Sequence, residues 1–284
     1  LPPEGAQRPS GGRAGADMEL NNVPARNGTL WVRLGLQAFF KQPLAFISLF
    51  FFFMAMVSIA SQLPLIGGTL ALVLLPAMTL GLMAASASPT ITPGVKPPAG
   101  SVFMAALRAV RQDLQPLLML GAIYAGCFLV VMGISALADG GQFAGVYLLG
   151  RPLTRETAQQ TDFQVALWIA MALYIPLSLA FWHAPALMHW HRVPPVKSIF
   201  FSLVACMRNI GALTVFGIVW LGVFIGAGIV ISLITGLMVA IGAMGGGEAA
   251  SAIGSVLMVG GALVMAAMFF SSIWFSFRDS FSED

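Results

Sequence analysis

The chain has 284 residues, of which 58% are hydrophobic and 9% are charged. Soluble domains carry about 25% charged residues, so this composition, with a mean hydropathy of +0.88, excludes an ordinary soluble domain. The formal net charge is +3, but the basic residues are scattered singly at the ends of apolar segments. That distribution is typical of membrane topology signals and argues against nucleic-acid binding.

The first 28 residues are rich in Gly, Pro, Arg and Ala and contain no apolar core of the signal-peptide type. We therefore expect a cytoplasmic arm rather than a cleaved leader. Residues 29–277 are expected to form one transmembrane domain, and residues 278–284 a short cytoplasmic tail.

Six apolar segments follow the arm, each near or above the roughly 20 residues that a membrane-spanning helix needs. They are Pro43–Ser61, Leu63–Ala87, Pro116–Ala138, Asp162–Trp182, Ile210–Met238 and Ala252–Phe275. In lipid every backbone polar group must find a partner within the protein, and these runs are too continuous for the alternating pattern of barrel strands. The sequence therefore predicts an all-α, polytopic membrane bundle of six transmembrane helices arranged as three hairpins.

Basic residues divide unevenly between the two ends of these spans. The connections after the first, third and fifth spans contain only Arg151 and Arg155. The arm, the other two connections and the C-terminus contain Arg8, Arg13, Arg26, Arg33, Lys41, Lys96, Arg108, Arg111, Arg192, Lys197, Arg208 and Arg278. Because cytoplasmic loops carry the excess of Lys and Arg, we expect both termini to lie in the cytoplasm.

A short amphipathic stretch precedes each odd-numbered span. These stretches are Thr29–Lys41, Ser101–Gln115 and Val196–Asn209. All three have helical period; the third sets Ser198, Ser202 and Asn209 against apolar residues such as Phe200 and Val204. We expect helices in the cytoplasmic interface, with polar faces toward the headgroups and aromatic side chains toward the acyl chains.

The resulting unit of one interfacial helix and two spans occurs three times. A weak internal repeat agrees with it, because the tripeptide at residues 42–44 recurs at residues 115–117, each time at the start of a span. The three units share one orientation, so the inverted repeat found in many alternating-access carriers is absent from this pattern. That absence weighs against a carrier.

The only histidines are His183, His189 and His191, and they lie within nine residues of one another. A metal or haem site is the sharper interpretation. On a helix, however, the three positions point in different directions, and no Cys or carboxylate stands nearby in the sequence to complete a site. We therefore expect anchoring at the membrane interface, with use by a partner's pigment or quinone as an alternative. The predicted anchors are Trp31, Trp182, His183, His189, Trp190, His191 and Arg192.

Glycines recur through the fifth span at Gly217, Gly222, Gly226 and Gly228. Small residues four apart let transmembrane helices approach closely. Two interpretations stay open: packing within the third hairpin, or an interface for another membrane subunit.

Prolines in or beside the spans are expected to kink them, and a kinked bundle can enclose a cavity although such kinks are ordinary in membrane helices. They are Pro64, Pro76, Pro176 and Pro185. Cys127 and Cys206 are read as packing residues, without pairing logic. No catalytic or metal-binding constellation can be assembled from the three histidines and the acids of the loops, so we expect no enzymatic activity, no metal and no intrinsic cofactor.

Two stretches carry a family resemblance. One runs from Asn22 to Arg26 and on through Trp31 to Leu44, and the other from Ala184 to Asn209. They resemble a family of uncharacterised six-helix inner-membrane proteins of β-proteobacteria. The resemblance covers about Met18 to Arg278 and leaves residues 1–17 outside. It implies a fold and a location but no activity, so no functional residue is carried over.

These patterns together favour a non-enzymatic integral membrane protein that is an accessory, assembly or scaffold subunit of a larger membrane complex, for example a photosynthetic or respiratory one. Its expected partners are membrane lipids and other membrane subunits. The alternative is a transporter or lipid-handling protein for a small or apolar solute. A polar cavity at the membrane midplane would favour the alternative.

Overall fold

The computed structural model describes residues 18–63, 66–88, 100–240 and 248–283. Six of its helices are long and apolar enough to cross a membrane. They are α2 (Pro43–Ser61), α3 (Gly67–Ala87), α5 (Leu114–Asp139), α8 (Thr161–Trp182), α11 (Ile210–Ala240) and α12 (Glu248–Ser280). The predicted all-α bundle of six spans is therefore confirmed. Four of the predicted positions, Pro64, Lys96, Arg8 and Arg13, lie outside the described residues.

Short helices lie between the spans. α1 (Asn27–Lys41), α4 (Ser101–Gln112) and α10 (Pro195–Arg208) each precede a hairpin, whereas α6 (Gln142–Leu149) and α7 (Arg155–Gln159) connect α5 to α8. A further short helix, α9 (Ala184–Trp190), continues the line of α8, so that the fourth candidate span extends to Trp190. The predicted order of one short helix and two spans, used three times, is confirmed.

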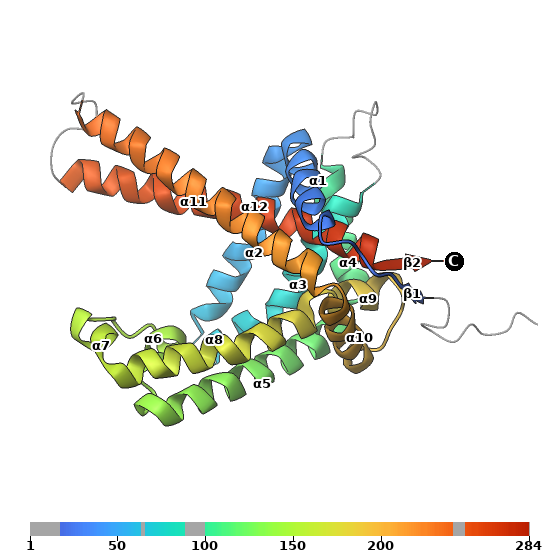
Figure 1. Cartoon of the computed structure of the whole chain (residues 1–284), viewed down its shortest axis with the longest axis horizontal. Coiled ribbons are helices and arrows are strands. Elements are labelled where there is room, and N and C mark those ends of the chain that lie inside the picture. The colour runs from blue at the N-terminus through green and yellow to red at the C-terminus, as the bar shows by residue number, and fades with distance from the viewer. Residues whose placement is uncertain (1–17, 64–65, 89–99, 241–247, 284) are drawn as a thin grey trace, which may run out of the picture.

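The two ends of the described chain pair with each other. Strand β1 (Met18–Leu20) runs antiparallel to β2 (Phe281–Glu283), with Met18 opposite Glu283. Figure 1 shows this pair beside α9 and α10 at one end of the bundle, opposite α6 and α7. An even number of spans requires this arrangement, in which both termini lie on one side of the membrane.

α3 and the C-terminal half of α12 form the centre of the bundle. α3 contacts α2, α4, α5 and α12, while α12 also contacts α1 and α11. Two glycines make these crossings close: a Cβ at Gly35 on α1 would collide with Ser272 on α12, and one at Gly121 on α5 with the backbone of Val73 on α3. At both positions the fold depends on the missing side chain, because only a bare backbone fits there.

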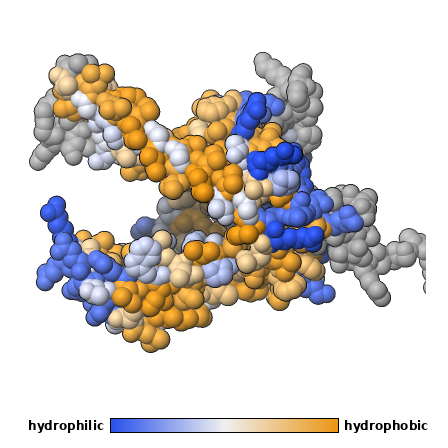
Figure 2. Space-filling model, viewed as in Figure 1, coloured by the Kyte–Doolittle hydropathy of each residue, from blue (hydrophilic) through white to orange (hydrophobic). Residues whose placement is uncertain are grey.

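The inner and outer parts of the third hairpin, formed by α11 and α12, differ in how they contact the bundle. The inner parts of α11 and α12 pack on the bundle, through residues such as Phe216, Trp220 and Phe275. Their outer parts extend away from it as a pair (Figure 1). At 31 residues, α11 is about 46 Å long, well beyond the roughly 30 Å of the hydrocarbon core. Figure 2 shows that a deep cleft separates this pair from α8, with predominantly apolar walls.

The amphipathic helices only partly follow the predicted orientation. On α1, Arg33 and Lys41 are exposed as expected. On α10 the expected orientation is wrong: Ser198 and Ser202 are fully buried, whereas Phe200 is 63% exposed. The apolar face of α10 is turned outward, as lipid permits, and the small hydroxyl residues face the protein because they fit between helices and find hydrogen-bond partners there.

Candidate functional site

A row of serines on α12 connects the helices at the end where the termini lie. Ser272, Ser276 and Ser280 are spaced four residues apart and therefore share one face of the helix, and all three are buried. Trp220 Nε1 of α11 donates a hydrogen bond to Ser272 Oγ at 3.1 Å, and Asn209 Nδ2 donates to Ser280 Oγ at 3.2 Å. The row holds α12 in place by hydrogen bonds within an apolar core.

His183 belongs to this row and not to the membrane interface. It is 1% exposed, and its Nε2 lies 3.1 Å from Ser276 Oγ, which also accepts a hydrogen bond from Trp182 Nε1 at 3.2 Å. Its backbone N–H donates to Ser202 Oγ at 2.9 Å. The prediction of an interfacial anchor at His183 is therefore wrong, because the break between α8 and α9 turns the imidazole inward.

Trp31 is also a core residue and not an anchor. Its side chain is fully buried, and its Nε1 donates to Asp279 Oδ2 at 2.8 Å. Trp182, Trp190 and His191 are partly buried, whereas Arg192 is exposed. The rings of Trp190 and Trp274 lie 4.5 Å apart in a tilted arrangement. Anchoring by these four residues stays a prediction.

A carboxylate does stand beside the histidine cluster, contrary to the sequence argument. Asp113, between α4 and α5, is 6% exposed. Its Oδ2 lies 2.5 Å from His189 Nδ1, and its Oδ1 accepts a hydrogen bond from Arg192 Nη1 at 2.9 Å. The partners are 76 and 79 residues apart in the chain, so no local pattern could reveal them. This buried group links the second hairpin to α9.

A pocket of about 350 Å³ lies where α8 and α12 come together beneath the cleft. Pro76 and Thr79 of α3, Tyr124 of α5, and Tyr174 and Ser178 of α8 contribute to its wall, together with aromatic side chains of α12. The hydroxyl oxygens of Tyr124 and Tyr174 are 3.4 Å apart. The pocket is therefore apolar with a few hydroxyl groups that converge on it, the usual make-up of a small-molecule site.

A second pocket of about 250 Å³ continues from the first along the groove between α5 and α8. Tyr174 lines both pockets, and Tyr147 of α6 lines the outer one. The chain has three tyrosines, and all of them lie on this line. Phe128 stands among them, with ring centroids 6.2 Å from Tyr124, 5.8 Å from Tyr147 and 6.1 Å from Tyr174. We call these two pockets the tyrosine groove.

None of the three tyrosines is a predicted site residue. Kinks are predicted at Pro76 and Pro176, with a cavity as one reading and ordinary helix bending as the other. Both prolines lie inside helices, and Pro76 contributes to the pocket wall. One feature of the sequence could have indicated this site: each helix-interior proline has hydroxyl residues two or three positions away. A proline there is where a helix bends, so the hydroxyl groups lie near the bend.

The glycines predicted as a partner interface do not pack inside the protein. A Cβ added at any of them would meet nothing within 4 Å. They are Gly217, Gly222, Gly226 and Gly228. Packing within the third hairpin instead uses Gly254 and Gly261, which face Thr235 and Ile231. An interface with another subunit at the four glycines stays a prediction.

Within the described ranges, no group of three or more His, Cys, Asp or Glu side chains could hold a metal ion. Cys206 lies near His183, with Sγ 3.9 Å from Nδ1, but burial raises the pKa of this thiol to about 12. The thiol is therefore neutral at ordinary pH.

The six apolar spans define an integral, polytopic membrane protein. The chain is 35% identical, over 267 residues, to a protein of Burkholderia thailandensis described as a probable inner membrane protein, and the match covers 93% of this chain and 94% of the relative. The chain belongs to the same family of inner-membrane proteins, as the sequence resemblance predicted. No protein-family model matches the chain, and no solved structure matches it.

Proposed function

We propose that this protein is a non-enzymatic inner-membrane protein that handles a lipid or another amphiphilic solute, which it binds in the tyrosine groove. The single observation that carries the proposal is the convergence of all three tyrosines on two neighbouring pockets that share Tyr174. The ligand class follows from the lining: an apolar body for the aromatic walls, and one polar group that exchanges hydrogen bonds with the tyrosine hydroxyls.

The position of the groove supports this choice over a scaffold without a ligand. Transmembrane helices that only pack have little reason to place hydroxyl groups in a hollow, because an unpaired polar group in hydrocarbon is costly. Thr79 and Ser178 satisfy their own hydroxyls on backbone carbonyls of Leu75 and Ile175. Tyr124 and Tyr174 share one long hydrogen bond between their hydroxyls at 3.4 Å. A hydroxyl can donate one hydrogen bond and accept two, so the pair retains capacity for a polar group of a solute.

Photolabelling of the full chain in nanodiscs tests the proposal. The probe is a fatty acid with a diazirine in mid-chain, and we expect labelled peptides to cluster at Tyr124 and Tyr174. The double variant Tyr124→Phe, Tyr174→Phe keeps the rings but removes both hydroxyls. Two hydrogen bonds of modest net strength correspond to about tenfold weaker binding, so labelling in the groove should fall by about that factor.

The matched control is Trp168→Phe, which changes an aromatic side chain that is 66% exposed on the same helix and should leave labelling unchanged. Labelling as strong on the lipid-facing Val256 and Val259 of α12 as in the groove would contradict the proposal, since it would reflect ordinary contact with bulk lipid. Undiminished labelling in the double variant would contradict it as well.

A second candidate function is that of a subunit which docks on another membrane protein through α11. The specific observation is that Gly222 and Gly226 are exposed, four residues apart, and free of contacts at the Cβ position. Glycine lowers the stability of a helix relative to alanine. In lipid, this cost is offset when a neighbouring helix packs closely against the glycine. This candidate needs α11 and not the tyrosine groove, so the two functions can be tested separately.

A further inference from the structure

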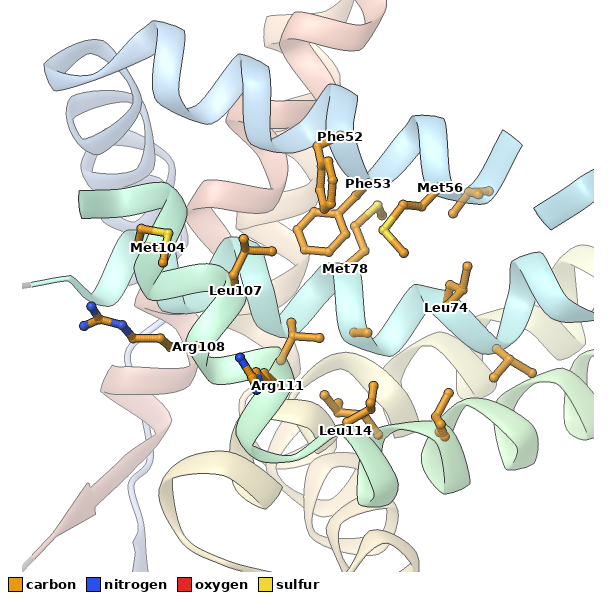
Figure 3. Close-up of a pocket in the computed structure, with 16 residues that line it drawn as sticks. Phe52, Phe53, Met56, Leu74, Met78, Met104, Leu107, Arg108, Arg111 and Leu114 are labelled. Atoms are coloured by element: carbon orange, nitrogen blue, oxygen red, sulfur yellow. The ribbon is translucent and has the colours of Figure 1, made fainter. Parts of the chain in front are cut away.

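An apolar hollow on α3 lies apart from the tyrosine groove, against α2 and α4. Its volume is about 430 Å³, and its walls come from α2, α3, α4 and the start of α5. Figure 3 shows Met56 and Leu74 toward one end, and Arg108 and Arg111 of α4 toward the other. We call it the α4 pocket. It shares Met78 with the inner pocket of the tyrosine groove but none of the tyrosines, so the inference does not depend on the proposed function.

The α4 helix has one face buried against the bundle and another that lines the pocket. Val102, Ala106 and Ala109 are buried against the bundle, and α4 has most of its contacts with α3. The face that lines the pocket carries a different set at helical spacing: Met104, Leu107, Arg108 and Arg111. Residues at i, i+3, i+4 and i+7 lie on one side of a helix, so two guanidinium groups share a face with apolar side chains at the edge of an apolar hollow.

Neither arginine has an acidic partner in the described part of the chain. The ion pairs found there involve Asp113 and Asp279. Asp113 is the acid closest to Arg111 in sequence, but both of its oxygens are taken by His189 and Arg192. Two exposed positive charges therefore stand at the edge of the pocket. An anion from outside the chain would complement them.

The hollow opens toward the side of the bundle. Several of its apolar side chains are well exposed, among them Phe52 at 39%, Met56 at 42% and Leu118 at 43%. In a membrane those side chains meet acyl chains, so a chain can enter from the bilayer without crossing a polar barrier. α4 lies at the end of the bundle where the two strands of the chain ends pair (Figure 1). Amphipathic helices at the ends of spans are typical of the headgroup region.

We infer that the α4 pocket binds an anionic phospholipid. Its phosphate lies against Arg108 and Arg111, and one acyl chain lies along Met104, Leu107 and Met78. Guanidinium groups pair with phosphate through parallel N–H···O bonds, and basic pockets between transmembrane helices are a recurrent way to hold acidic lipids. The apolar lining requires an acyl chain as well as the phosphate, so the occupant is a membrane lipid and not a free phosphate compound.

Mass spectrometry of the intact protein released from nanodiscs tests this inference. The nanodiscs contain phosphatidylglycerol and phosphatidylcholine with the same acyl chains, in equal amounts, and the ratio of bound lipids is measured. The protein should retain phosphatidylglycerol preferentially. In Arg108→Gln, Arg111→Gln the preference should fall by about thirtyfold, the factor for two arginines near an anionic surface.

The matched control is Arg151→Gln, Arg155→Gln, which removes the same charge from the exposed connection between α6 and α8 and should leave the preference unchanged. The variant Arg108→Lys, Arg111→Lys should recover part of it. Equal loss in the Arg108→Gln pair and in the control pair would overturn the inference, because the preference would then follow net charge alone.

A second pair of variants tests the acyl chain. Leu118→Trp fills the exposed side of the pocket and should weaken retention, whereas Leu137→Trp, on the same helix at a side chain that is 87% exposed, should not. If glycerol phosphate in solution displaced phosphatidylglycerol, or if Leu118→Trp retained it fully, the site would be one for free phosphate and the inference would be wrong.

Discussion

At the residue scale, the polar side chains of this protein act in buried pairs between distant helices. Asp113 with His189 and Arg192, and Ser276 with Trp182 and His183, are such groups. In a soluble protein a lost hydrogen bond can be replaced by water. Within an apolar bundle, removal of one partner leaves the other unsatisfied, and its full desolvation penalty then lowers stability.

Asp113→Asn should therefore destabilise the protein by about 1–3 kcal/mol, since it weakens the pairing with His189 and removes the charge opposite Arg192. Arg192 has a side chain that is 63% exposed, so most of the loss comes from the His189 contact. Thermal unfolding followed by tryptophan fluorescence in detergent measures it. Asp162→Asn, an exposed acid in the first turn of α8, is the control, and an equal shift in both variants would speak against the buried link.

At the element scale, the glycines of the short helices and those of α11 have opposite roles. Gly35 stands where α1 crosses α12, and a Cβ there would collide with Ser272. Gly222 has open space around it. A small side chain is therefore excluded at one position and allowed at the other, although both are glycines in apolar helices.

Gly35→Ala should lower the unfolding temperature, with a cost of about 1–3 kcal/mol from overpacking, whereas Gly222→Ala should leave it unchanged or raise it slightly because alanine favours a helix. Thermal unfolding of both variants gives the comparison. Gly222→Leu, which the fold also accommodates, separates folding from docking: if α11 binds another subunit, co-purified protein should be lost while the unfolding temperature is kept. Equal destabilisation at both positions would contradict this distinction.

At the scale of the whole molecule, the pairing of β1 with β2 places both termini at one end, and the distribution of Lys and Arg predicts that this end is cytoplasmic. Alkaline phosphatase, which is active only outside the cytoplasm, should be inactive when fused after Asn209 and active when fused after Gly150. A β-galactosidase fusion at the same sites is the control with the opposite response. The reverse pattern of activities would mean that the termini lie outside the cytoplasm, contrary to the prediction.

The sequence by itself determined the class of fold, the six spans, the three short helices before the hairpins and the family. These depend on properties that act locally: the length of an apolar run against the thickness of the hydrocarbon core, and the breakers between runs. The proline positions also predicted where helices could bend. Pro43 and Pro116 mark the starts of two spans, and the structure places both in the first turn of a helix.

Only the tertiary structure decided which side of each helix faces protein and which faces lipid. Both environments are apolar, so the spans are apolar all round and carry little periodic signal of their burial. For that reason the sequence indicated close packing at Gly222, whereas the fold packs closely at Gly35. It also predicted that Ser202 faces outward, although Ser202 is buried, and it did not predict the contact between Asp113 and His189. The convergence of three tyrosines on one groove depends in the same way on helix rotation and crossing, which contacts between distant segments set.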